Sequence, residues 1–240
     1  MTRYFFLSLA LILNIAAFGQ ELTGDQLLEK AISFHDPNNN WPAFKGKLFI
    51  EMETPNSSLR KTEVQINFPA NFFKSIVSKD GNVIESELNN GDCTIKLNGS
   101  TEIDQTDIKE LNLTCERAEM MKNYYTYLYG LPMKLKNPGT IIDKKVVKKS
   151  FKGKEYLVLK VKYDENVGKD TWYFYFDPST YAMEVYQFYH DESKNDGEYI
   201  LLKGTTDIND IKMPKVRSWY YNNDDKYLGT DTLTKVSELN

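Results

Sequence analysis

The segment Trp172-Tyr-Phe-Tyr-Phe-Asp-Pro-Ser-Thr-Tyr-Ala-Met-Glu-Val-Tyr-Gln-Phe-Tyr-His190 predicts a β-hairpin whose strands are aromatic on both faces. Its turn is Asp177-Pro178-Ser179-Thr180, where proline sets φ and the aspartate and serine side chains can bond the local backbone. The first strand places its side chains on alternate faces, with Trp172, Phe174 and Phe176 on one and Tyr173 and Tyr175 on the other. A half-exposed hairpin alternates apolar with polar side chains instead. Both faces are therefore expected to be covered, by a helix, another sheet or a ligand.

The rest of the chain predicts a large antiparallel sheet. In the segments 45–54 and 61–68, apolar side chains alternate with charged or polar ones, which is typical of strands with one buried face. Asp80-Gly81 and Asn90-Gly91 are hairpin signals. Further strands are expected near residues 157–163, 199–205, 212–221 and 230–236. We expect an α+β, mainly β fold: a single large curved antiparallel sheet, an open half-barrel, with helices capping its concave face.

Two segments predict these helices. Thr23 and Gln26 have the spacing of a capping box, and an apolar stripe follows at helical period until the turn at residues 36–40. A second helical segment is expected over residues 106–129. Its apolar stripe consists of Met120, Met121, Tyr124, Tyr125 and Leu128.

The first residues predict export. Arg3, the apolar run 5–13 and the small residues Ala17 and Gly19 form the pattern of a secretory signal peptide over residues 1–19. The apolar run is shorter than the ~20 residues of a membrane-spanning helix, so a protein that does not span the membrane is expected. Residues 20–240 are predicted to form one domain, periplasmic or secreted.

The cysteine content agrees with export. Cys93 and Cys115 are the two cysteines of the chain, and a disulfide between them is the natural pairing in an oxidising compartment. Two buried free thiols are the alternative.

The charge pattern argues against nucleic acid as a partner. The chain has 30 basic and 34 acidic residues, a formal net charge of −4, and the two signs are interspersed. The basic run at residues 144–149 predicts a solvated strand edge, with contact to an anionic surface as the alternative.

Catalytic motifs of hydrolases, nucleotide-binding enzymes and zinc peptidases are missing from the sequence. The sharpest catalytic hypothesis is a metal-dependent hydrolase in which His35-Asp36 and His190-Asp191 supply imidazole and carboxylate ligands. The simpler interpretation is that each His-Asp pair ends a helix or strand. We therefore expect a non-enzymatic protein without a cofactor.

The aromatic content, 13% of the residues, indicates either a ligand cavity or a solid aromatic core. The candidate cavity residues are Trp172, Phe174, Phe176, Tyr124, Tyr125 and Met121. On the first hypothesis the protein binds a hydrophobic ligand, a lipid or an acylated protein, in the cell envelope. On the second it is a secreted or periplasmic interaction module with a filled core.

Several motifs resemble a known but uncharacterised family of secreted Bacteroidetes proteins. They are His35-Asp36-Pro37 with Trp41, the segments 123–136 and 170–178, and Ile211-Lys-Met-Pro214 before Trp219-Tyr220. More distantly, the pattern resembles the LolA/LppX-like superfamily of periplasmic lipoprotein and lipid carriers. That resemblance implies an N-terminal helix, a strongly curved antiparallel sheet and helices over an apolar cavity. The cysteine pair and the tyrosine-rich helix depart from the lipoprotein carriers, and no catalytic residue carries over.

Overall fold

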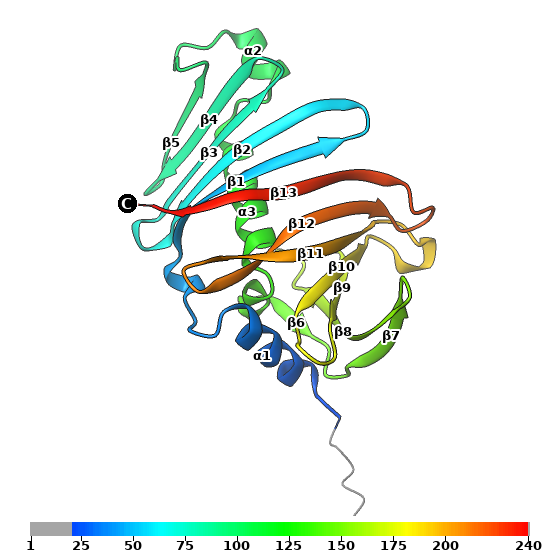
Figure 1. Cartoon of the computed structure of the whole chain (residues 1–240). Coiled ribbons are helices and arrows are strands. Elements are labelled where there is room, and N and C mark those ends of the chain that lie inside the picture. Colours follow the sequence, from blue (N-terminus) through cyan, green and yellow to red (C-terminus); the bar gives the residue numbers. More distant parts are fainter. Residues whose placement is uncertain (1–20, 240) are drawn as a thin grey trace, which may run out of the picture.

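The computed structural model describes residues 21–239, which form a single antiparallel sheet of 13 strands with helices on its concave side (Figure 1). The strand order is β5-β4-β3-β2-β1-β13-β12-β11-β10-β9-β8-β6, with β7 also paired to β8. The ends of this order do not pair with each other, so the sheet is open. The predicted fold class is confirmed, whereas the predicted signal peptide lies outside the described residues.

The first strands are β1 (Lys45–Thr54), β2 (Ser57–Asn67), β3 (Phe72–Lys79), β4 (Asn82–Asn89), β5 (Asp92–Leu97), β6 (Thr140–Ile142) and β7 (Val147–Phe151). The others are β8 (Lys154–Tyr163), β9 (Thr171–Phe176), β10 (Met183–Tyr189), β11 (Glu198–Ile208), β12 (Ile211–Tyr221) and β13 (Tyr227–Glu238). The α-helices are α1 (Gly24–His35), α2 (Gln105–Glu110) and α3 (Cys115–Gly130). Short 3-10 turns lie at η1 (Trp41–Ala43), η2 (Phe68–Ala70), η3 (Met133–Lys136) and η4 (Glu192–Lys194).

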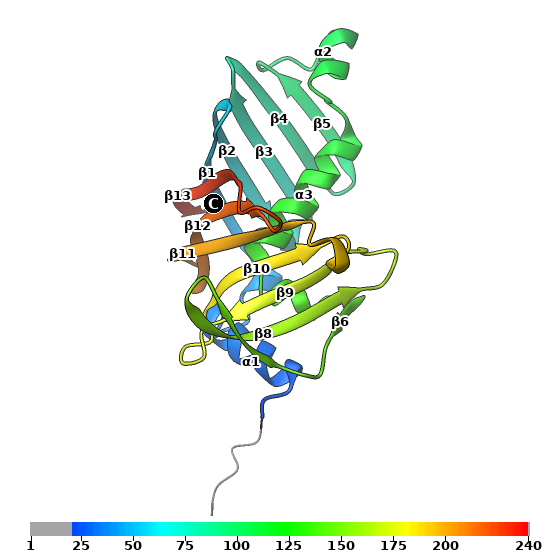
Figure 2. The same cartoon turned by 90° about the vertical axis from the view of Figure 1, so that its right-hand side faces the viewer.

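Chain order explains how the sheet encloses a helix. Strands β1–β5 form one half, and α2 and α3 then carry the chain along the concave side to the other half, β6–β12 (Figure 2). The last strand, β13, inserts between β12 and β1 and joins the two halves. Helix α3 therefore contacts β4, β5 and β12, and α1 packs against β8 and β12.

The aromatic hairpin forms as the sequence predicts, from β9 and β10. Its turn is held by the Asp177 carboxylate, which accepts hydrogen bonds from the backbone N–H groups of Ser179 and Thr180, each at 2.9 Å. Lys154 Nζ lies 2.8 Å from the same carboxylate. This ammonium and the turn N–H groups hold the pKa of Asp177 far below its usual range.

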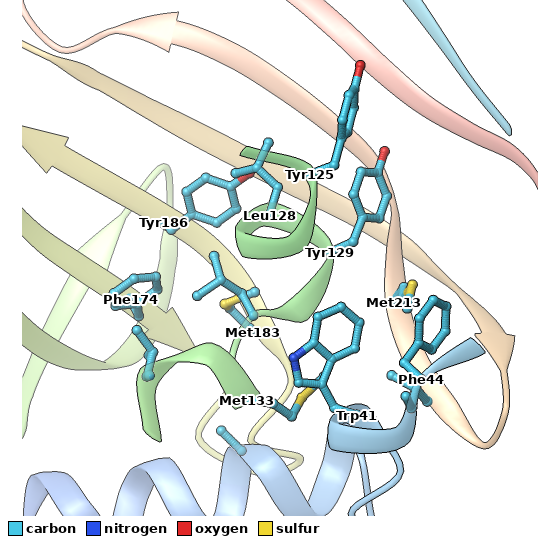
Figure 3. Packing of buried hydrophobic residues seen from close by; sticks show 14 of the residues in the cluster. Trp41, Phe44, Tyr125, Leu128, Tyr129, Met133, Phe174, Met183, Tyr186 and Met213 are labelled. Atoms are coloured by element: carbon cyan, nitrogen blue, oxygen red, sulfur yellow. The ribbon is translucent and has the colours of Figure 1, made fainter. Parts of the chain in front are cut away.

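Both faces of the hairpin are covered, in different ways. On the concave face, Phe174 and Phe176 are completely buried in the main core, which Figure 3 shows around the end of α3. On the convex face, Tyr175 is buried by Phe151 and Tyr156, whose ring centroids lie 5.1 and 5.8 Å from its own. These two residues belong to β7 and β8, so part of the sheet itself covers the second face.

The segment predicted as one helix over residues 106–129 contains two helices, α2 and α3. The chain breaks between them because Asn112 adopts a left-handed conformation, with φ of 52°. Thr114 then caps α3, its hydroxyl accepting a hydrogen bond from the Arg117 N–H at 3.1 Å. The predicted disulfide between Cys93 and Cys115 is present and joins β5 to the first turn of α3.

The other end of α3 packs closely on η1. A Cβ atom added at Gly130 would lie only 2.3 Å from the Trp41 ring, so glycine allows the helix to approach this indole. Helix α3 is thus fixed at its first residue by a covalent bond and at its last by close packing.

Candidate functional site

The concave face is filled in one half of the sheet and only partly covered in the other. Near the end of α3, Leu128 and Tyr129 pack among Met183, Tyr186 and Phe174, all buried (Figure 3). In strands β2–β4, burial decreases along the concave face of each strand away from this core. Phe73 and Leu88 are buried, but Val77 and Ile84, farther along the same concave face, remain half-exposed. Apolar surface is therefore left accessible beneath α2 and α3.

A cavity of about 140 Å³ lies at this place, between strands β2–β4 on one side and α3 with the turn that precedes it on the other. We call it the upper cavity; its lining consists of Arg60, Ser75, Val77, Ile84, Ser86, Leu111, Asn112, Leu113, Thr114, Arg117, Met121 and Tyr125. The apolar members come from both the sheet and the helices, and the polar members include two arginines. The lining thus suits a molecule with an apolar part and a polar part.

A second hollow lies on the other side of α3, next to the β6–β8 edge. We call it the tyrosine groove; it has a volume of about 530 Å³ and includes Tyr124, Tyr127, Lys134, Pro138, Tyr163 and Val167 in its lining. An adjoining space of about 230 Å³ extends it to Trp172. The hydroxyls of Tyr127 and Tyr163 are hydrogen-bonded at 2.7 Å, and burial raises the pKa of Tyr163 to about 12.

The structure separates the six predicted cavity residues into three groups. Met121 and Tyr125 line the upper cavity, and Tyr124 and Trp172 line the tyrosine groove and its extension. Phe174 and Phe176 lie in the filled core. Alternation within β9 gave the correct face for these two side chains, but it could not show how closely the core packs around them.

Sequence reasoning missed a row of charged residues on the concave face. Strand pairing aligns Arg60 of β2 with Met52 of β1, Met52 with Asp231 of β13, and Asp231 with Arg217 of β12. Directly paired residues project from the same side of a sheet, so these side chains lie beside one another beneath α3. We call this set the Arg–Asp–Arg row. Burial raises the pKa of Asp231, against the opposing effect of the two arginines.

Arg217 links this row to α3. It is completely buried, and its guanidinium donates hydrogen bonds to the carbonyls of Pro214 at 2.9 Å and Leu128 at 3.2 Å. The same group lies 4.0 Å from the centre of the Tyr129 ring, a cation–π contact. One residue of the sheet thus holds the backbone and a side chain of the last helical turn.

The first of the two histidines has a structural role. His35 is buried, its Nδ1–H donates to the Lys212 carbonyl at 2.6 Å, and its Nε2 accepts from the Met183 N–H at 3.0 Å. Burial lowers the pKa of His35 to about 4, so the ring is neutral near pH 7. The adjacent Asp36 carboxylate accepts from the N–H groups of Asn40 and Trp41, at 2.7 and 2.8 Å. The His-Asp pair therefore ends α1 and shapes the turn.

The buried imidazole predicts acid sensitivity. Because the folded-state pKa of about 4 lies below the ordinary 6.5, the unfolded chain binds the additional proton, and stability falls as the pH drops through this window. Between pH 6.5 and about pH 4, the free energy of unfolding of the wild type should fall by up to about 3 kcal/mol more than that of a His35→Gln variant. Urea unfolding of both proteins across this range measures the difference, and parallel pH profiles would contradict the assignment.

The second histidine lies far from the first. His35 binds the start of β10 at Met183, whereas His190 follows the end of this strand at Tyr189. An extended strand of this length spans roughly 20 Å, well beyond the separation of two ligands of one metal ion. His190 instead pairs with Asp170 at 2.7 Å, which raises its pKa and closes the open end of the hairpin. The hypothesis of a metal site shared by the two His-Asp pairs is therefore wrong, and the simpler interpretation, that each pair ends a helix or strand, agrees with both positions.

Two further findings concern the described residues as a whole. Residues 21–239 contain no group of three or more His, Cys, Asp and Glu side chains placed to hold a metal ion. Within the same residues, no helix combines the length and the apolar character needed to cross a bilayer.

One solved structure supports the fold assignment, and a second is reported for comparison. A LolA superfamily protein from Nitrosomonas europaea has 10% sequence identity and a TM-score of 0.54, covering 92% of this chain and 95% of its own. A putative outer membrane lipoprotein-sorting protein domain from Vibrio parahaemolyticus has 13% identity and a TM-score of 0.48. The alignment covers 88% of this chain and 91% of that domain. At 10% identity, the likeness to the Nitrosomonas europaea protein shows the fold alone, and this fold is LolA-like. No curated protein matches the chain in sequence.

The sequence as a whole matches a single family over almost its full length. The match covers residues 2–236, and the family is described as a family of unknown function. The chain therefore belongs to the DUF6503 family.

Proposed function

We propose that this protein is an exported, non-enzymatic binding protein that holds a hydrophobic or amphipathic molecule in the upper cavity. The ligand class is a lipid, or the acyl group of an acylated protein. The half-exposed apolar side chains of Val77 and Ile84, on the concave face beneath α2 and α3, carry this proposal. Burial of such surface by a ligand contributes roughly 25 cal/mol per Å². The LolA-like fold is consistent with this use of the concave face.

Ligand entry requires α2 and the turn that joins it to α3 to move outward, because the disulfide holds the first residue of α3. The upper cavity measures about 140 Å³, which is smaller than the ~300 Å³ at the lower end of typical ligand pockets. The turn at Asn112 separates α2 from α3, and the Cys93–Cys115 disulfide restrains this end of α3 against β5. We expect α2 and this turn to open as a flap, while α3 stays fixed by the disulfide at one end and by Arg217 at the other.

Export to an oxidising compartment is supported by the signal-peptide pattern of residues 1–19 and by the cysteine pair. The proposed binding protein is therefore periplasmic or secreted. The filled half of the sheet then serves as the scaffold that holds the cavity walls.

A cavity-filling substitution tests the proposal. Ile84→Trp places an indole in the upper cavity and should weaken binding of the neutral fluorescent probe N-phenyl-1-naphthylamine by about tenfold or more. The matched control is Ile76→Trp, because Ile76 adjoins Val77 in β3 and therefore points to the convex face. Val167→Trp fills the tyrosine groove and should leave the affinity unchanged.

The titration has two results that would contradict the proposal. One is the absence of saturable probe binding to the wild type. The other is equal affinity of the wild type and Ile84→Trp together with weaker binding by Val167→Trp, which would place the ligand in the tyrosine groove.

A further inference from the structure

The arginines of this chain are distributed unlike its lysines. The described residues contain only three arginines, Arg60, Arg117 and Arg217, and all three lie beneath or on the helices that cover the concave face. Lysines supply the exposed positive charge, for example in the ion pairs Lys61–Glu51 and Lys154–Glu184. Arginine differs from lysine in presenting a planar fork of donors that fits carboxylate and phosphate groups.

Two of these guanidinium groups have weak partners. Arg60 and Arg117 both line the upper cavity, and their terminal nitrogens contact methionine sulfur atoms, Met52 Sδ at 2.8 Å and Met120 Sδ at 3.7 Å. The Nε atom of Arg60 is buried without a hydrogen-bond partner among residues 21–239. Over the same residues, neither arginine has a carboxylate oxygen within 4.0 Å. A thioether is a weak acceptor, so these donors retain most of their capacity for an anion.

The charge balance around the cavity is positive, although the chain as a whole has a net charge of −4. In the Arg–Asp–Arg row, two guanidinium groups accompany a single carboxylate, Asp231. Arg117 adds a further positive charge from the helical wall. Asp231 lies between Arg217 and Arg60 and offsets part of the charge of both, so a net positive charge remains beside the cavity, to which Arg117 adds.

We infer that the upper cavity recognises an anionic head group, a carboxylate or a phosphate, of an amphiphile whose apolar chain lies on Val77, Ile84 and Met121. This inference rests on the proposed function and specifies its ligand class. Ser75 and Ser86, which are paired across β3 and β4 on the cavity floor, add hydroxyl donors for the same head group. An amphiphile with a neutral head group leaves the buried Arg60 donor unpaired and binds more weakly.

The test is a set of calorimetric titrations of the full mature chain with single-chain amphiphiles, each below its micelle concentration. Laurate and dodecyl phosphate carry the two candidate head groups, and dodecanol is the neutral counterpart. We expect each anion to bind about tenfold or more tightly than dodecanol, and Arg60→Gln and Arg117→Gln each to reduce this preference several-fold. Comparing laurate with dodecyl phosphate identifies the preferred head group.

The matched control is Lys61→Gln, which removes one positive charge from the next residue of β2 on the convex face and should leave the preference unchanged. Arg60→Lys keeps the charge without the fork and should give an intermediate preference. Equal affinity for dodecanol and both anions would overturn the inference while leaving the proposed function intact. Failure of all three amphiphiles to bind the folded wild type would overturn both.

Discussion

The Arg217→Met variant is expected to lose about 3–5 kcal/mol in free energy of unfolding, because breaking a buried charge interaction leaves its partners uncompensated. Arg217 is completely buried and donates to the Pro214 and Leu128 carbonyls. Its removal leaves the Leu128 carbonyl without this donor and Asp231, which is 4% exposed, without the cation of the neighbouring strand. Urea unfolding followed by circular dichroism measures the loss.

A second variant keeps this prediction testable if Arg217→Met folds poorly. Adding Asp231→Asn removes the buried carboxylate that the first substitution leaves unpaired, and it should restore about 1–3 kcal/mol. A double variant as unstable as the sum of the two single variants would show that the charges do not interact. A stable Arg217→Met protein would show that α3 is held by packing alone.

Loss of the disulfide has the second largest expected effect. Cys93→Ala with Cys115→Ala removes a link between residues 22 positions apart, which should cost about 3 kcal/mol through the entropy of the unfolded chain. Because Cys115 begins α3, hydrogen exchange should also accelerate in α2 and in the first turns of α3, while β8–β12 remain protected.

Reduction provides the control for this prediction. A reducing agent should lower the stability of the wild type to that of the double variant and leave the double variant unaffected. Equal stability of the oxidised wild type and the variant would mean that packing of α3 against β4 and β5 is sufficient to hold this end of the helix.

Local patterns predicted much of the fold. The turn at Asp177 and the capping box of Thr23 and Gln26 form as their spacing indicates, because each depends on hydrogen bonds between residues close in sequence. The Asp80-Gly81 and Asn90-Gly91 turns also form, with positive φ at all four residues. Alternation within strands likewise assigned the correct face to the aromatic residues of β9.

The candidate site depended on information that a local pattern does not contain. Arg60, Asp231 and Arg217 become neighbours only through the register of four strands, including the return of β13 to β1. His35 likewise meets its partners Met183 and Lys212 only in the folded chain. The sequence offered one unused signal, the scarcity of arginine beside abundant lysine. The packing that buries Phe174 and leaves Ile84 accessible arises from the placement of α3, which no periodicity specifies.

The most direct test of ligand binding in the upper cavity is mass spectrometry of the organic extract from the protein isolated without detergent from its native cell envelope. The Ile84→Trp variant, isolated in parallel, serves as the reference because its cavity is filled. We expect an amphiphile to be recovered with the wild type in amounts comparable to the protein, and to be strongly depleted in Ile84→Trp. Recovery of no lipid from the wild type, or of equal amounts from both proteins, would contradict it.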